Sequence, residues 1–206
     1  MPTKKQILER NKKMEKVKND LANFLASPLY KFRIKNKYFS VIGEGSHFAK
    51  IMFIGEAPGK KEAQTGKPFC GASGKFLDEL LKSVDLKREN VYITNIVKDR
   101  PQENRDPTAN EIMAYGPFLE QQIEIIKPLI IATLGRFSMQ YIMEKFDLKK
   151  EIEPISKTHG KNYISKTNYG KIKIIPFYHP AAALYNGGMR DILKKDFKIL
   201  KNILSD

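Results

Sequence analysis

The chain has 206 residues, of which 41% are hydrophobic, and its formal net charge is +14. This composition excludes an intrinsically disordered protein, and the length is enough to bury a core without disulfides. No apolar run approaches the ~20 residues that a membrane span needs, and the charged start lacks a signal peptide's apolar region. The only cysteine is Cys70, which excludes an internal disulfide and any site that needs two thiolates. We expect an intracellular, cytoplasmic protein with a single domain over residues 1–206.

The positive charge is unevenly distributed, since the basic excess lies before residue 51 and after residue 144. A basic surface attracts polyanions and speeds the encounter with DNA or RNA. A lysine-rich solvated surface without such a partner is the plainer interpretation. Charge alone leaves both interpretations open.

The N-terminal segment, residues 3–26, predicts an amphipathic helix that ends before Pro28. Residues 30–50 mix aromatic and basic side chains and are expected to be loop or extended. We expect residues 1–42 to form an N-terminal helix and basic extension packed on the domain. The apolar positions at roughly helical spacing are Ile7, Met14, Val17, Leu21, Phe24 and Leu25.

Four short β-branched or apolar runs follow, and each precedes turn chemistry or a Gly/Pro signal. Because helical patterns alternate with these runs, the sequence predicts an α/β fold with a parallel sheet covered by helices on both faces. Ligands bind beyond the carboxyl ends of the strands in such sheets. The strand runs are Lys50–Ile54, Val91–Asn95, Leu129–Leu134 and Lys171–Tyr178, and the helical ones are Gly74–Val84, Thr108–Ile126, Ser138–Phe146 and Arg190–Leu204.

Two loops that follow the first run contain candidate binding residues. Residues 55–59, GEAPG, can bring backbone amides close to a ligand oxygen, although a plain turn is the commoner role of such a loop. Phe69 lies further on, in a loop between Pro68 and small residues. It can plug the core, which is commoner, or form a platform on which a base stacks.

Polar residues end two later runs. Asn95 can cap a turn, or its amide can recognise the imide edge of a base through one donor and one acceptor. His179 can donate to an oxygen that gains negative charge, although a lone histidine is more often an ordinary hydrogen-bonded one. The other histidines, His47 and His159, complete no metal site without cysteines or a carboxylate cluster. Each signal is weak alone, but their order on successive strand ends is specific.

Five motifs follow one another along the chain. They are GEAPG, GKPFCGASGKFL, VYITNIVKDRP with NRDPT, LIIATLGR and YHPAAALYN. With these motifs, the chain from about Gly43 to about Leu200 resembles family 4 of the uracil-DNA glycosylase superfamily. The resemblance implies a three-layer α/β/α sandwich with a central, mostly parallel four-stranded sheet. It implies a monomer that flips deoxyuridine out of single- or double-stranded DNA and hydrolyses the N-glycosidic bond, leaving an abasic site.

The resemblance also implies roles for individual residues. The catalytic set would be His179 facing uracil O2, Asn95 reading the polar edge, and Glu56 orienting water and stabilising the sugar cation. Phe69 would stack on uracil. Because no lysine is placed like a Schiff-base nucleophile, we expect no lyase step. Gly55 and Ala57 would complete the substrate pocket, and the DNA contacts would be Gly59, Lys60, Arg105, Ala181, Leu184, Tyr185 and Arg190.

The chain departs from family 4 at the four cysteines that usually bind an iron–sulfur cluster. Phe24, Ser27, Asp99 and Tyr115 stand at the matching positions. Since none of them supplies a thiolate, we expect no cluster and no other cofactor. We expect Phe24 and Tyr115 to pack together, with Asp99 accepting from Ser27 or from a nearby basic group.

Three alternatives to a uracil-DNA glycosylase were weighed. A related branch bonds covalently to the DNA through a histidine in a basic insertion, but residues 99–108 are short and contain no histidine. A non-catalytic DNA-binding member would not be expected to keep Glu56, Phe69, Asn95 and His179 together. A glycosylase for another deaminated base, such as hypoxanthine, remains open.

Overall fold

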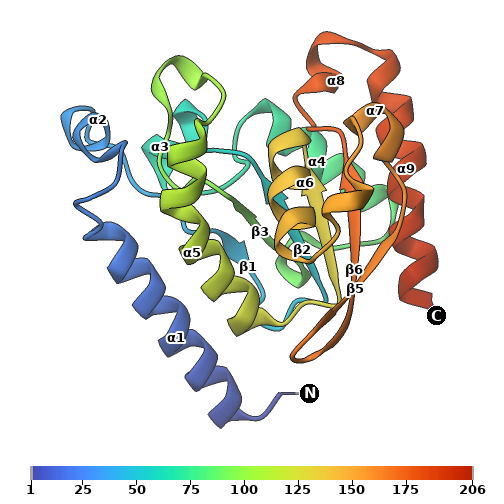
Figure 1. Cartoon of the computed structure of the whole chain (residues 1–206), viewed down its shortest axis with the longest axis horizontal. Helices are drawn as coiled ribbons and strands as arrows, with labels where there is room; N and C mark the ends of the chain where they lie inside the picture. The colour runs from blue at the N-terminus through green and yellow to red at the C-terminus, as the bar shows by residue number, and fades with distance from the viewer. Residues whose placement is uncertain (1, 206) are drawn as a thin grey trace.

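The computed structural model, which describes residues 2–205, is built on a six-stranded mixed sheet. The strand order is β1-β3-β2-β4-β6-β5 (Figure 1). The four inner strands are parallel to one another, and each edge strand pairs antiparallel with its neighbour. The strands are β1 (Glu44–Gly45), β2 (Ile51–Gly55), β3 (Tyr92–Asn95), β4 (Ile130–Leu134), β5 (Tyr163–Thr167) and β6 (Gly170–Phe177).

The expected four-stranded sheet is therefore the parallel centre of a wider sheet, and the prediction missed both edge strands. β1 is too short for any periodicity, and β5 alternates only between half-buried and exposed positions. An edge strand needs no continuous apolar run, because it is buried less than a central parallel strand. Residues 30–50 were also predicted too simply, since they contain a short helix as well as β1.

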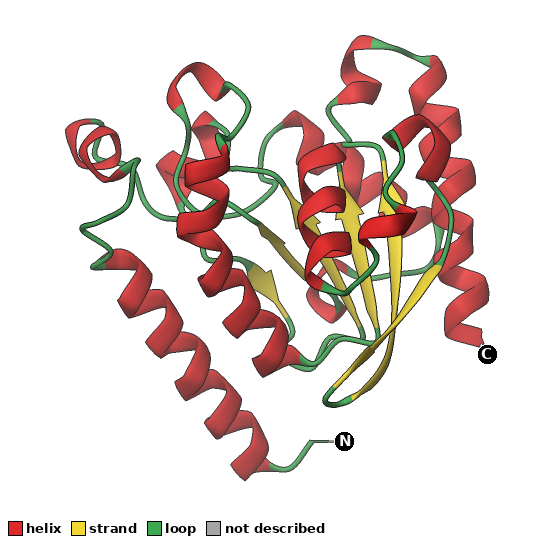
Figure 2. Cartoon of the chain, in the orientation of Figure 1, coloured by secondary structure: helices red, strands yellow, loops and turns green. Residues whose placement is uncertain are grey.

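Helices cover both faces of the sheet, which confirms the three-layer α/β/α architecture (Figure 2). Alternate strand residues point to opposite layers, as the pleat requires. Phe53 and Ile93 belong to the core beneath α4 and α9, whereas Met52 and Ile131 belong to the core beneath α5 and α6. These four helices are α4 (Ala72–Ser83), α5 (Ala109–Ile126), α6 (Arg136–Lys145) and α9 (Gly188–Ser205).

The N-terminal helix α1 (Lys4–Ala22) packs along α5 (Figure 1). Thr3 caps it in a reciprocal box with Gln6, and Met14, Val17 and Leu21 are its buried residues. It ends one turn earlier than expected. The remaining short helices are α2 (Tyr30–Lys35), α3 (Lys60–Thr65), α7 (Ile155–Thr158) and α8 (Ala182–Tyr185).

The parallel strands bring their carboxyl ends to one edge of the sheet, at the top of Figure 1. The loops after β2, β3 and β6 gather there together with α3 and α8. This is the edge at which parallel sheets bind ligands. Within the part of the chain that the structure describes, no helix has the length and apolar character needed to cross a membrane.

Candidate active site

A cavity of about 510 Å³ opens at this edge of the sheet. Eleven of the residues assigned from the sequence line it, although they come from five separate stretches of the chain. Gly55 and Arg190 do not line it. The lining residues that had been assigned are Glu56, Ala57, Gly59, Lys60, Phe69, Asn95, Arg105, His179, Ala181, Leu184 and Tyr185.

Asn95 stands on the cavity floor at the end of β3 and is only 2% exposed. Its Oδ1 atom is buried and has no hydrogen-bond partner. Gly55, the neighbouring residue on β2, leaves space for it, because a Cβ atom there would collide with Oδ1 and lie 2.7 Å from Cζ of Phe69. Buried acceptors rarely stay unpaired. This oxygen is therefore available to an N–H group of a ligand.

Phe69 forms a wall of the cavity in an unusual backbone conformation, with a φ of 46°. Glu62 holds the loop around it, since its Oε1 accepts hydrogen bonds of 2.9 Å from the amides of Cys70 and Gly71. Glu62 also lines the cavity, and the sequence analysis gave it no role. No sequence pattern joins a helical glutamate to a loop eight residues later, so only the fold reveals this contact.

His179 lies just beyond β6, and its ring stacks against Phe69 with 5.7 Å between centroids. Burial lowers the pKa of His179 to about 4, and Glu62 opposes this shift. The amide of Ala181 donates to Nδ1 at 3.1 Å. A neutral imidazole that accepts at Nδ1 carries its proton on Nε2. His179 therefore offers an N–H donor without being a cation near neutral pH.

Glu56, the residue after β2, lines the cavity and also contacts the start of α6. Its Oε1 accepts from the amide of Phe137 at 3.2 Å, as a carboxylate commonly does at a helix N-terminus. Burial raises the pKa of Glu56, and Asp106 adds to this, whereas Phe137 and Arg136 oppose it. The carboxylate is thus fixed by the fold at the wall of the cavity.

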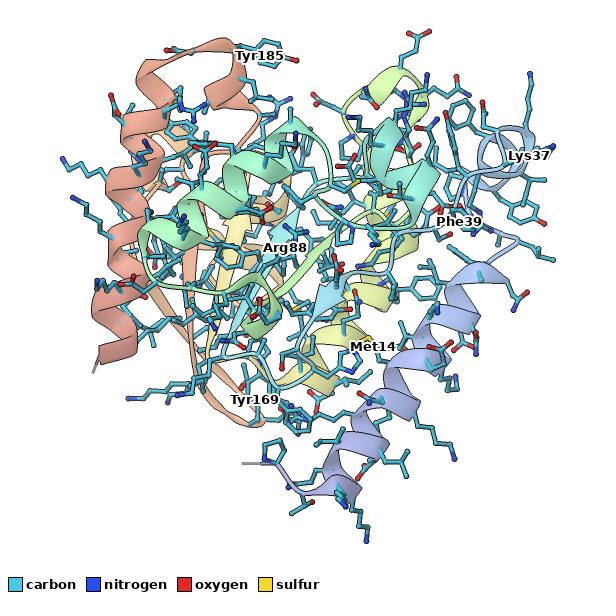
Figure 3. All side chains as sticks on the ribbon, turned by 180° about the vertical axis from the view of Figure 1, so that it is seen from behind. Met14, Lys37, Phe39, Arg88, Tyr169 and Tyr185 are labelled. Carbon is cyan, nitrogen blue, oxygen red and sulfur yellow. The ribbon has the colours of Figure 1, made fainter. Side chains whose placement is uncertain are left out.

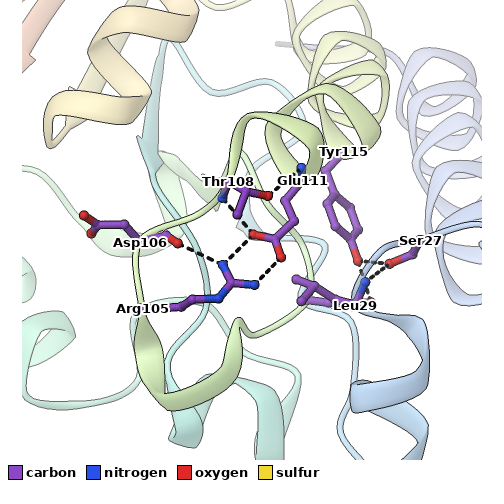
Figure 4. Close-up of polar contacts among 8 residues, drawn as sticks. Ser27, Leu29, Arg105, Asp106, Thr108, Glu111 and Tyr115 are labelled. Atoms are coloured by element: carbon purple, nitrogen blue, oxygen red, sulfur yellow. Dashed lines mark hydrogen bonds and ion pairs between the residues drawn. The ribbon is translucent and has the colours of Figure 1, made fainter.

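The two arginines assigned to DNA contacts differ in position. Arg105 forms a bidentate ion pair with Glu111, with N–O distances of 2.9 and 2.6 Å, and so pins the loop before α5 (Figure 4). It still lines the cavity. Arg190 instead donates to Glu79 at 2.7 Å and covers the ring of Phe76, so it joins α9 to α4.

The rim of the cavity carries two exposed apolar side chains from α8. Leu184 is 43% exposed and Tyr185 is 91% exposed. Tyr185 projects from the top of the molecule into solvent (Figure 3). A large exposed aromatic side chain beside a cavity is typical of a surface that contacts a ligand.

Comparison with known proteins identifies the family. The model of the uracil DNA glycosylase superfamily matches residues 42–205. A type-4 uracil-DNA glycosylase of Saccharolobus solfataricus is 51% identical over 178 residues, 86% of this chain and 80% of that protein. The type-4 enzyme of Archaeoglobus fulgidus is 48% identical over 80% of this chain and 81% of that protein. The one of Sulfurisphaera tokodaii is 45% identical over 92% of this chain and 84% of that protein. The chain belongs to family 4 of this superfamily.

The four positions at which family 4 usually has cluster cysteines lie together, between α1, α5 and the loop after β3. Phe24 packs edge-on against Tyr115, with 5.8 Å between ring centroids, as predicted. The hydroxyl of Tyr115 donates to Asp99 at 2.7 Å, and Arg33 lies 3.4 Å from the same carboxylate. The expected basic partner of Asp99 is therefore Arg33.

Ser27 makes a different contact from the one expected, since its hydroxyl bonds to Tyr115 rather than to Asp99 (Figure 4). Tyr115, Asp99 and Ser27 are buried, so side chains fill this site. A phenol, a hydroxyl, an aromatic ring and one carboxylate do not fit an iron–sulfur cluster, which is held mainly by thiolates. The residues of this family 4 member thus disagree with the cofactor that its family implies.

Proposed function

We propose that the chain is a DNA repair enzyme that hydrolyses the N-glycosidic bond of deoxyuridine in DNA. It releases uracil and leaves an abasic site. The observation that carries the proposal is the unpaired Oδ1 of Asn95 beside the neutral N–H donor of His179, in a cavity walled by Phe69. These groups complement the imide edge, the O2 atom and the flat face of uracil.

Recognition follows from the groups that meet in the cavity. A uridine flipped out of the strand stacks on Phe69, a contact that contributes ~1–3 kcal/mol per base. Oδ1 of Asn95 accepts from uracil N3–H, and its amide group donates to O4. Cytosine has no N3–H and carries an amino group at C4, so it leaves both functions of the Asn95 amide unpaired when the amide keeps this orientation.

His179 acts on the charge that forms as the bond breaks. The bond from the sugar carbon to uracil N1 breaks, and its electron pair leaves with the base. Nε2–H of His179 donates to the uracil O2 that becomes negative. One positioned donor to a developing oxyanion typically accounts for ~2.7–4 kcal/mol of the barrier.

Glu56 serves the other half of the reaction. Its carboxylate stabilises the oxocarbenium character of the sugar and orients the water molecule whose oxygen bonds to the sugar carbon, by analogy with other glycoside hydrolyses. The proton of that water passes to Glu56 and then to solvent. Its bond to Phe137 keeps the carboxylate at the cavity wall.

Contacts with the DNA strand surround the cavity. Leu184 and Tyr185 hold the gap left by the flipped base, because apolar wedges stabilise such distorted steps. Gly59, Lys60 and Ala181 face the backbone, and Arg105 does so with the part of its guanidinium that Glu111 leaves exposed.

The organisation of the enzyme is simple in this proposal. Residues 1–206 act as one monomeric domain inside the cell, where the substrate DNA lies, and residues 1–42 are packed on it. No iron–sulfur cluster takes part, because the network around Tyr115 occupies the corresponding site. Arg190 acts through the packing of α9 on α4 and so supports the neighbouring helix α8, which carries Tyr185.

The test uses a labelled oligonucleotide that carries one deoxyuridine, incubated with the protein and then treated with alkali. Wild type is expected to produce alkali-labile sites. The cleavage rates of Asn95→Ala and His179→Ala are each expected to be lower by a factor of about 10²–10³. DNA binding without cleavage would support a non-catalytic DNA-binding protein instead. If the protein cleaves a matched oligonucleotide that contains hypoxanthine and does not cleave the deoxyuridine one, the substrate base is hypoxanthine and not uracil.

A further inference from the structure

Lys98 is a fully buried lysine that contacts Asn95, one of the residues lining the cavity. Its ammonium donates to the hydroxyl of Thr94 at 2.8 Å, to the backbone carbonyl of Asn95 at 2.7 Å and to Oε1 of Gln122 at 2.5 Å. All three acceptors are uncharged, and together they use the three donors of the ammonium.

A charge in this position is costly to bury. Burial lowers the pKa of Lys98 well below its ordinary value. An apolar side chain of similar length would fill the same space without that desolvation penalty. Packing alone therefore gives no reason for an amine here, whereas the three acceptors that it satisfies do.

The groups that Lys98 joins belong to the support of the cavity floor. Thr94 also donates to the carbonyl of Ile42 at 2.8 Å. The amide of Gln122 donates to the same carbonyl and to the hydroxyl of Tyr92, each at 2.8 Å. The network thus ties the end of β3 to α5 and to the segment before β1. Lys98 makes its short contact with the carbonyl of Asn95, at 2.7 Å, whereas the Thr94 hydroxyl lies 3.5 Å from the same oxygen.

Asn95 is held from two sides. Its backbone is paired with Gly55 on β2, while Lys98 holds its carbonyl oxygen. Its side-chain oxygen has no partner of its own in the protein. The position of that oxygen in the cavity therefore depends on where the backbone of Asn95 is anchored.

We propose that Lys98 is a positioning residue for uracil recognition, because its ammonium anchors the main chain of Asn95 and so aims the Asn95 amide at the base. This inference rests on the proposed function. It assigns to Lys98 an effect that passes through Asn95 and through no other group of the cavity.

A double-mutant cycle with Lys98→Met and Asn95→Ala tests the inference. Single-turnover rates on the deoxyuridine oligonucleotide and inhibition by free uracil are measured for the four proteins. In the wild-type background we expect Lys98→Met to lower the rate at least tenfold and to weaken inhibition by uracil. In the Asn95→Ala background, Lys98→Met is expected to alter the rate less than twofold, because the side-chain amide that Lys98 positions is no longer present.

Gln122→Met is the matched control, since it removes the network's contacts with Ile42, Tyr92 and one Lys98 donor and leaves the bond between Lys98 and Asn95 in place. We expect it to reduce thermal stability while changing uracil inhibition less than Lys98→Met does. If Lys98→Met does not fold, Lys98→Gln, which keeps a polar group, takes its place. We expect Lys98→Gln also to slow the reaction in the wild-type background and to change it little in the Asn95→Ala background.

The outcomes separate the two proposals. An inactive wild type would overturn the proposed function. An active wild type in which Lys98→Met, or Lys98→Gln in its place, slows both backgrounds by the same factor would overturn only the role of Lys98. So would an unchanged rate and unchanged uracil inhibition in either variant.

Discussion

At the residue scale, His179 combines a low pKa with a defined tautomer. Its Nδ1 is occupied by the amide of Ala181, and burial lowers its pKa to about 4. If His179 were protonated to the cation, its Nδ1–H group would face the amide N–H of Ala181. The fold therefore selects a neutral donor, which can stabilise departing uracil without first becoming charged.

The low pKa of His179 predicts how stability depends on pH. The folded pKa of about 4 lies below the ordinary histidine pKa of 6.5, so the unfolded chain binds more protons between these values. Stability should therefore fall as pH falls through this window. Relative to His179→Gln, wild type is expected to lose on the order of 2 kcal/mol of unfolding free energy between about pH 7.5 and pH 5.

Urea unfolding of both proteins at the two pH values measures this difference. The variant is the control for carboxylates elsewhere, because their titration is common to both proteins. Parallel losses in wild type and variant would contradict a depressed pKa for His179.

At the element scale, the network around Tyr115 joins α5 to the turn after α1 and to the loop after β3. Tyr115→Phe leaves Asp99 and Ser27 buried without the hydroxyl that pairs them. Losing a buried hydrogen-bond partner typically costs ~1–3 kcal/mol. We expect that loss in urea unfolding, with the rate of uracil release per folded molecule unchanged.

Tyr169→Phe is the matched control for this variant, because the Tyr169 hydroxyl is buried without a partner and its removal should cost nothing. Iron analysis of anaerobically purified wild type gives a second measurement. A content of about four irons per chain, the number in a [4Fe–4S] cluster, would contradict the replacement of the cluster by this network.

At the scale of the whole molecule, the net charge of +14 predicts a strong dependence of DNA binding on salt. The lysines of α1 and α9 are exposed, so the charge is available at the surface. If about two phosphates are neutralised, affinity should fall roughly tenfold between about 50 and 200 mM salt. The single-turnover cleavage rate at saturating enzyme should stay constant, because Asn95 and Phe69 are buried and His179 is neutral.

Fluorescence anisotropy of a labelled oligonucleotide measures this affinity, and single-turnover cleavage at saturating enzyme measures the rate. A salt-independent affinity would favour the plainer interpretation, in which the lysines only solvate the surface.

The amino-acid pattern was enough to predict the centre of the fold and most of the residues that line the cavity. Strands buried on both faces must be continuously apolar, so β2, β3, β4 and β6 were visible as runs. The order of GEAPG, Phe69, Asn95 and His179 placed the candidate groups on strand ends, and the single cysteine argued against a cluster.

Features that depend on contacts between distant segments became visible in the folded chain alone. The polar edge strand β5 has no apolar period, and the pairing of Glu62 with the loop of Phe69 has no local signal. Lys98 reads as an ordinary surface lysine until the fold buries it against Thr94, Asn95 and Gln122. Burial and hydrogen bonding are properties of the packed chain, because the partners that satisfy a polar group come from other elements.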